Sequence, residues 1–309
     1  MHNRPNYIKK DRGLTIRMLF TGLMLALAYV FLFGLLLISG INYLFVIIFG
    51  IGMVFFQYFM SDKLVLMTTK AKVVSQEEYP ELHNSVERLS LIAGIPKPKN
   101  IAVMEMEAPN AFATGRSPKH ATIAVTTGLM TRLSKDELDA VIGHELAHVK
   151  NRDVMVMTWA SLIVVIAGYL MQMLFWMSIF GGFGGNRRQG GGQAIALLML
   201  VYVGVIVIYF MSQLLLRALS RYREFAADRD GAIIYGSPST LASALRKISS
   251  QIATIPEKDL RQVEHANAFF IIPALQGNAV ASLMSSHPPT EERIKKLVDL
   301  ERNNWHLMN

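Results

Sequence analysis

Four long apolar blocks limit the possible folds of this chain more than any other feature of its sequence. A helix of about 20 apolar residues crosses a hydrocarbon layer about 30 Å thick. SGIN separates the first two blocks, and a glycine-rich link, residues 181–193, separates the last two. We therefore predict four transmembrane helices in two hairpins, residues 18–60 and 154–216. A cleaved signal peptide is disfavoured because the first block is too long and no small-x-small cleavage site follows it.

The distribution of charge predicts on which side of the membrane the polar regions lie. The formal net charge is +8, and five basic residues precede the first apolar block: Arg4, Lys9, Lys10, Arg12 and Arg17. Positive charge beside a span favours the cytoplasmic side. Residues 1–17 are therefore predicted to be cytoplasmic, and pairs of crossings return residues 61–153 and 217–309 to that side. Arg187 and Arg188 then lie outside, which leaves open whether the second hairpin crosses completely.

Composition narrows the possible partners and metal ligands. The basic residues form no single stripe or tail, so we predict no nucleic-acid partner. The chain has no cysteine, which excludes disulfides and thiolate metal sites and leaves histidine and carboxylate ligands. We predict a multi-pass protein of the cell (inner) membrane whose partner is the lipid bilayer. Nothing in the sequence indicates an oligomeric state.

The polar regions predict a small α+β domain built from residues 61–153 and 217–309. KNIAVMEM and HATIAVTTGL have strand-like patterns, whereas QEEYPELHNSVERLSLIAG has the pattern of an amphipathic helix that ends at Gly94. SKDELDAVIGHELAHV predicts a second helix, in which Ser134 is the N-cap and Glu137 completes a capping box. The predicted fold class is a mainly α membrane protein with a small α+β domain.

The second of these helices carries the pattern HELAH, which is typical of a zinc site. His144 and His148 lie four residues apart, so one face of a helix can present both imidazoles to one ion. Glu145 projects to the side and can reach a water molecule at the metal without being a ligand. The pattern also arises by chance, and helical histidines can be solvated, so a third ligand is needed to support a metal site.

The third ligand is predicted to be Glu224, in LSRYREFAADRDGA directly after the last apolar block. Asp228, one helical turn later, can accept the free N–H of a ligating histidine. Alternatively, Glu224 is a surface carboxylate among neighbouring arginines. We prefer the metal site because His148 precedes one transmembrane helix and Glu224 follows the next, which predicts matching heights above the membrane. One Zn²⁺ per chain would then have His144, His148 and Glu224 as ligands, although another divalent ion suits the same set.

Four motifs together resemble the HtpX-type membrane metallopeptidases, which are related to the CAAX prenyl endopeptidases within the gluzincins. These motifs are PNAFATG, HELAHVKNRD, SRYREFAADRDGA and SSHPPTEERI, spanning residues 109–294 in the order of that family. The resemblance implies a thermolysin-like minigluzincin core, endopeptidase activity on membrane proteins and a role in envelope stress. It also implies the same three ligands, Glu145 as general base and Asp228 as the partner of a ligating histidine.

The resemblance adds a substrate-binding prediction at Asn110 and Ala111. These residues match the positions at which gluzincins hold the substrate backbone along an edge strand. An edge strand has unpaired N–H and C=O groups to which an extended peptide can add. From the residues alone, PNAFATG is better explained as a turn in which Asn110 bonds its own backbone.

His287 has two interpretations. It can stabilise the oxyanion that forms on the scissile carbonyl, as histidine does in related zinc proteases. It can equally be part of a helix start, because SHPPTEERI offers Thr290 as a cap followed by glutamates in the first turn.

The sequence as a whole favours a membrane-embedded zinc endopeptidase that cuts misfolded or surplus membrane proteins on the cytoplasmic side. A prenyl-protein (CAAX-type) peptidase is the alternative enzyme, but such relatives usually have more spans. A transporter or non-catalytic membrane scaffold is the alternative of another class. Transport is disfavoured because transporters carry charged residues inside their spans, and these blocks have essentially none.

Overall fold

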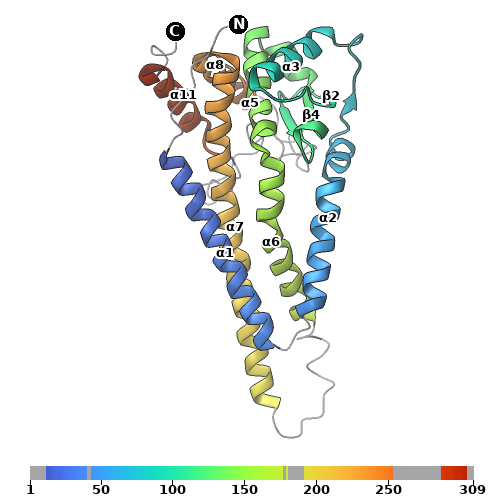
Figure 1. Cartoon of the computed structure of the whole chain (residues 1–309), viewed down its shortest axis with the longest axis vertical. Helices are drawn as coiled ribbons and strands as arrows, with labels where there is room; N and C mark the ends of the chain where they lie inside the picture. The colour runs from blue at the N-terminus through green and yellow to red at the C-terminus, as the bar shows by residue number, and fades with distance from the viewer. Residues whose placement is uncertain (1–11, 40–42, 177–178, 180–190, 253–286, 305–309) are drawn as a thin grey trace. The chain divides into compact units, whose positions relative to one another are not determined.

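The computed structural model describes residues 12–39, 43–176, 179, 191–252 and 287–304 (Figure 1). The chain divides into two compact units. The polar unit consists of Met1–Leu14, Phe59–Val156 and Ser220–Asn309, and the apolar unit consists of Thr15–Tyr58 and Met157–Leu219.

The apolar unit consists of long helices that expose large apolar side chains. Its helices belong to α1 (Arg12–Ser39), α2 (Tyr43–Thr68), α6 (Asp153–Trp176) and α7 (Gly191–Tyr235). Leu19, Val30 and Leu200 are among its exposed residues. Apolar side chains that point away from the protein over such lengths are suited to contact with lipid.

Three helical segments are long and apolar enough to cross a membrane among the residues that the structure describes: Thr15–Leu35, Asp153–Trp176 and Ala196–Tyr235. The sequence predicts a fourth span over residues 41–60, most of which lies in α2, and this span stays a prediction. The glycine-rich link was predicted over residues 181–193, but α7 begins at Gly191, and the link before that residue lies outside the described residues. α7 also continues past residue 216, where the last apolar block ends, and its residues from Ser220 belong to the polar unit.

The polar unit contains a four-stranded sheet with the strand order β1-β2-β4-β3. The central strands β2 (Asn100–Met104) and β4 (Thr122–Thr126) are parallel and lie within the two predicted strand runs. β1 (Lys72–Val73) and β3 (Ala111–Thr114) pair antiparallel with their neighbours. Among the described residues, β3 is therefore an edge strand, and it lies in the segment PNAFATG.

Alternating side chains of the sheet enter two separate apolar clusters. Ala102, Phe112 and Ala124 pack against Val65 near the end of α2. Ile101 and Ile123 belong to the larger core, which also contains residues of α3 (Pro80–Ala93), α5 (Lys135–Asn151), α8 (Pro238–Ile252) and α11 (Thr290–Asn304). A short helix, α4 (Thr127–Arg132), follows β4 directly. Because both faces of the sheet are covered, β4 is buried along its whole length.

The helix ends that the sequence predicts are confirmed where local chemistry determines them. Ser134 Oγ accepts a hydrogen bond from Glu137 N, and Glu137 Oε2 accepts one from Ser134 N, at 3.3 and 3.0 Å. This reciprocal capping box fixes the start of α5. α3 ends at Gly94, whose φ of 72° is left-handed, as glycine allows without a steric cost. Both signals are local, so tertiary packing was not needed to predict them.

Candidate metal centre

Close backbone packing brings the two predicted ligand segments together. A Cβ atom on Gly231 of α7 would lie 2.6 Å from the Cα of His144, and one on Gly143 would lie 3.1 Å from the carbonyl oxygen of Gly231. Only glycine permits α5 and α7 to approach so closely at these positions. Glu224 and Asp228, on the same helix as Gly231, are thereby carried to the face of α5 that bears the histidines.

Two imidazoles and one carboxylate converge within the polar unit. The Nε2 atoms of His144 and His148 are 3.1 Å apart. Glu224 Oε2 lies 3.7 Å from His144 Nε2, and its Oε1 lies 3.5 Å from His148 Nε2. Ligand atoms around a tetrahedral zinc ion are separated by about 3.3 Å if each bond is about 2.05 Å. The three side chains therefore have the spacing that one metal ion requires.

The hydrogen bonding of the two rings also fits a cation between them. His148 Nδ1 lies 2.6 Å from Asp153 Oδ2, and His144 Nδ1 lies 3.1 Å from Asp228 Oδ1. If each Nδ1–H is directed to a carboxylate, both Nε2 atoms of the neutral rings present lone pairs. Two lone pairs 3.1 Å apart repel each other, and a shared metal ion removes that repulsion.

Glu145 lies in the same buried region as these groups. Its side chain follows His144 on α5 and is 4% exposed. Its negative charge is one of those that raise the pKa of Arg293. The carboxylate therefore interacts electrostatically with a group of the centre. A residue that exchanges protons at the centre must lie this close to it.

Arg293 is a residue of this centre that the sequence reasoning missed. It is fully buried on α11 and donates two hydrogen bonds to Asp228, from Nε at 2.8 Å and from Nη2 at 2.7 Å. Its Nη1 lies 3.5 Å from Glu224 Oε2. Burial lowers the pKa of Arg293, but the attraction of Asp228 and the other carboxylates outweighs burial and raises the pKa above its ordinary value. In sequence, an arginine following two glutamates in TEER looks like a solvated helix residue.

Asp153 and Arg223 are two further buried residues that the sequence reasoning did not assign to the centre. Asp153 is the first residue of α6 and receives His148 Nδ1–H on one oxygen. Its other oxygen forms an ion pair with Nη2 of Arg223. The sequence showed Arg223 only as a neighbour of Glu224, because nothing local connects it with a residue 70 positions earlier.

His287 lies beside the third predicted ligand. Its Nδ1 is 3.3 Å from Glu224 Oε1, so the residue is part of the same cluster. The helix-start interpretation is partly correct as well, because α11 begins immediately afterwards with Glu291 and Glu292 in its first turn. Thr290 is the first helical residue and not the cap before it, a difference of one position.

Asn110 and Ala111 lie at the start of the edge strand. Asn110 N donates to Thr126 Oγ1 at 2.9 Å, and Thr126 N donates to Asn110 O at 2.9 Å, so the Asn110 backbone is directed to β4. In an antiparallel pair the direction alternates with each residue. The N–H and C=O groups of Ala111 and Ala113 are therefore directed away from β4, as addition of a peptide strand requires.

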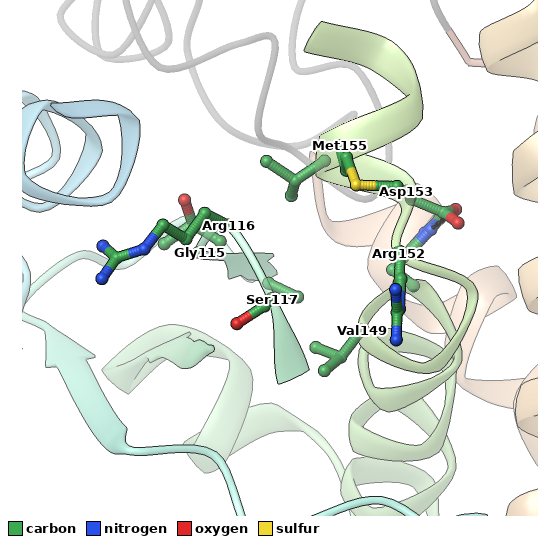
Figure 2. A pocket seen from close by; sticks show the side chains of 11 residues that line it. Gly115, Arg116, Ser117, Val149, Arg152, Asp153 and Met155 are labelled. Atoms are coloured by element: carbon green, nitrogen blue, oxygen red, sulfur yellow. Dashed lines mark hydrogen bonds and ion pairs between the residues drawn. The ribbon is translucent and has the colours of Figure 1, made fainter. Parts of the chain in front are cut away.

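A small pocket lies between the end of this edge strand and His148 (Figure 2). One wall consists of the end of β3 and the turn after it. The other consists of the end of α5 and the start of α6, including His148. The lining residues are Ala113, Thr114, Gly115, Arg116, Ser117, His148, Val149, Arg152, Asp153, Val154 and Met155. The pocket is therefore bordered both by the end of the edge strand and by a histidine that is a predicted ligand.

The chain is similar to known proteins over nearly its whole length. The model of "Peptidase family M48" matches residues 76–301. A "Protease HtpX homolog" of Moorella thermoacetica is 51% identical over 94% of this chain and 96% of its own. "Protease HtpX homolog 2" of Methanosarcina acetivorans is 50% identical over 95% of this chain and 97% of its own.

A solved structure shares the fold at lower sequence identity. The crystal structure of S. mikatae Ste24p aligns with a TM-score of 0.56 and 19% identity, covering 92% of this chain. The alignment spans 66% of the Ste24p chain. The apolar helices, the geometry of the candidate metal centre and the full-length relatives agree, and we conclude that the chain belongs to peptidase family M48, as a membrane metalloprotease of the HtpX type.

Proposed function

We propose that this protease is a zinc-dependent endopeptidase that hydrolyses misfolded or surplus membrane proteins on the cytoplasmic side of the cell (inner) membrane. The observation that carries the proposal is the convergence of His144, His148 and Glu224 at the spacing of one metal ion. An endopeptidase needs to hold an extended chain across its catalytic groups, and the edge strand β3 is the element that would do so.

His144, His148 and Glu224 would hold one Zn²⁺ per chain. When bound, the ion supplies Lewis-acid polarisation of the scissile carbonyl and lowers the pKa of the attacking water. Two further carboxylates, those of Asp228 and Asp153, would orient the ligand histidines. Asp153 would accept the Nδ1–H of His148, and Asp228 Oδ1 lies 3.1 Å from His144 Nδ1, so both Nε2 atoms would be left to bind the metal.

Glu145 would transfer the proton during hydrolysis. Its carboxylate accepts a proton from water as the water oxygen bonds to the carbonyl carbon, and it then delivers that proton to the leaving nitrogen as the C–N bond breaks. The buried position of Glu145 favours proton transfer to the substrate over exchange with bulk water.

Two further groups would act on the substrate. The outward N–H and C=O of Ala111, next to the Asn110 side chain, would bind the substrate backbone in the manner of an added strand. His287, beside Glu224, would donate a hydrogen bond to the oxyanion on the former carbonyl oxygen. A stress-related quality-control role is part of the proposal and is supported by the similarity to HtpX homologues. Four spans with cytoplasmic termini are also part of it, supported by the four apolar blocks and the basic residues before the first block.

The proposal is tested with the full chain in proteoliposomes and a membrane protein that carries one scissile loop on a defined side. Cleavage should stop when a chelator removes the metal and return when Zn²⁺ is added. Metal analysis of the purified protein should give one zinc per chain, and Glu224→Ala should reduce that content. Cleavage that continues unchanged in chelator would contradict the proposal, as would cleavage of only those loops on the non-cytoplasmic side.

A further inference from the structure

A single left-handed residue separates the helix that carries both histidines from the helix after it. α5 ends at Asn151 and α6 begins at Asp153, and Arg152 between them has φ 55° and ψ 41°. Figure 2 shows Arg152 and Asp153 at this junction. Among the described residues, Arg152 and Lys70 alone have positive φ without being glycine. Such a conformation is strained for a residue with a Cβ atom and persists only where the surrounding structure holds it.

The break determines where the side chain of Asp153 points. Asp153 follows His148 by five residues, and in a continuous α-helix two such side chains would lie about 140° apart around the axis. The carboxylate would then be unable to reach the outer nitrogen of the ring. In this structure Asp153 Oδ2 lies 2.6 Å from His148 Nδ1. The Arg152 N–H caps the preceding helix at His148 O and Val149 O, so the turn is tightly defined.

Arg223 holds the second oxygen of the same carboxylate. Its Nη2 forms an ion pair with Asp153 Oδ1, and both residues are at most 7% exposed. The guanidinium comes from α7, the helix that also carries Glu224. A carboxylate with a partner bound to each of its oxygens has little freedom to rotate, so it can fix the orientation of the imidazole.

We propose that Arg152, Asp153 and Arg223 are positioning residues for His148. The left-handed backbone at Arg152 turns Asp153 onto His148 Nδ1, and Arg223 locks Asp153 in that orientation. This inference rests on the proposed function in that it takes His148 to be a zinc ligand. It assigns a role in the metal site to a backbone conformation and to two side chains outside the ligand set.

The primary experiment measures Zn²⁺ affinity of the full chain in detergent, by competition with a chromophoric chelator. Asp153→Ala should weaken binding by about 10- to 100-fold, and Asp153→Asn should weaken it less because the amide oxygen still accepts the Nδ1–H. Arg223→Met should also weaken binding, whereas Arg223→Lys should restore part of the affinity. Arg221→Met, at a partly exposed arginine of the same helix, is the matched control and should bind as the wild type does.

A second series tests the backbone conformation directly. Arg152→Gly keeps the left-handed turn without strain, so affinity should stay within about twofold of the wild type. Arg152→Val disfavours that turn and should weaken zinc binding on the order of tenfold or more. Lys70→Val is the matched control, because it introduces the same conformational conflict at the other left-handed residue, away from the metal centre. It should lower the melting temperature without changing zinc affinity.

Cobalt substitution supplies a readout that a purely structural role would not move. The visible absorption bands of bound Co²⁺ should shift in Asp153→Ala and Arg152→Val and stay unchanged in Arg152→Gly and Lys70→Val. Equal zinc affinities and identical cobalt spectra in Asp153→Ala and the wild type would overturn the inference, provided that the wild type binds zinc. A wild type that binds no zinc would overturn the proposed function instead.

Discussion

His144 and His148 have similar hydrogen-bond partners, but the surroundings of the two rings are built differently. Each presents Nε2 to the centre and Nδ1 to a carboxylate that forms an ion pair with a buried guanidinium. The side chain of His144 is 1% exposed, and its support comes from regular helices α7 and α11. The side chain of His148 is 16% exposed, and its carboxylate comes from a strained helix break five residues away.

The comparison shows how buried charge is distributed around the centre. Beside His144, the positive charge of Arg293 balances the negative charge of Asp228; these residues form the His144 side. Beside His148, the charge of Arg223 balances that of Asp153; these residues form the His148 side. Glu224 and Glu145 then remain to balance a divalent ion. The His144 side depends on long-range packing, so damage there should affect folding as well as metal binding. The His148 side depends on local backbone geometry as well as on Arg223, so a change of the backbone at Arg152 should affect metal affinity more than folding.

The largest effect is expected from a substitution that changes neither the His144 side nor the His148 side of the centre. Glu145→Gln removes the group that transfers the proton but neither ligand nor ligand support. We expect kcat to fall by about 10²- to 10⁴-fold with unchanged zinc content. Cleavage of a membrane-bound substrate and metal analysis of the same preparation check this. Activity close to that of the wild type would exclude Glu145 as the base.

The second-largest effect compares how much the His144 side and the His148 side contribute to the free energy of unfolding. Arg293→Met leaves Asp228 buried without its counter-charge, so we expect a loss of about 3–5 kcal/mol in unfolding free energy. Arg223→Met should cost less, because Asp153 and His148 are nearer to solvent. Thermal melting in detergent with zinc removed measures both. Arg302→Met, at an exposed position of α11, is the control, and equal losses at 293 and 223 would remove the asymmetry on which the comparison rests.

A smaller effect is expected at the edge strand, which belongs to neither side. Asn110→Ala should lower kcat/KM by about tenfold, the value of one hydrogen bond to the substrate backbone. Zinc affinity should not change, because Asn110 is outside the predicted ligand set and its backbone bonds to Thr126 of β4. Steady-state kinetics together with chelator competition check this, and a parallel loss of zinc would make the residue structural for the centre.

The smallest effect lies at the start of α5 and depends on pH. Burial raises the pKa of Glu137, but hydrogen bonds from Lys247, Ser134 and Ser243 outweigh burial and lower it. A carboxyl group whose pKa is lower in the folded state stabilises the fold above its unfolded pKa, and this contribution is lost as pH falls through the folded pKa. Glu137→Gln should therefore destabilise the protein by about 1 kcal/mol at pH 7.

The difference between Glu137→Gln and the wild type should shrink as the pH falls below about 4.3, the ordinary pKa of a glutamate. Melting temperatures in detergent at several pH values measure this. Lys247→Met should reproduce part of the loss at pH 7 because it removes the ion pair at 2.7 Å. A difference that stays constant across the pH range would mean that the charge of Glu137 contributes nothing.

The sequence alone determined the features that depend on neighbours within one or two helical turns. His144, Glu145 and His148 share a helix because their spacing matches its period, and the capping box at Ser134 fixes where that helix starts. Apolar blocks likewise indicate membrane helices by length and composition, and among the described residues three segments form helices long and apolar enough to cross a membrane. The identity of the predicted third ligand, Glu224, was available from a second motif, but its distance from the histidines was not.

Only the tertiary structure decided which distant groups support the ligands. Arg293 looks like a surface residue in its own helix, and it is buried because α11 packs where its guanidinium meets Asp228. Asp153 looks out of register with His148, and it reaches the ring because one residue adopts a left-handed conformation. The periodicity of a helix and the length of an apolar block are properties of one local segment. The burial of a charged side chain and a left-handed break between two helices depend on contacts that form only when separate segments meet.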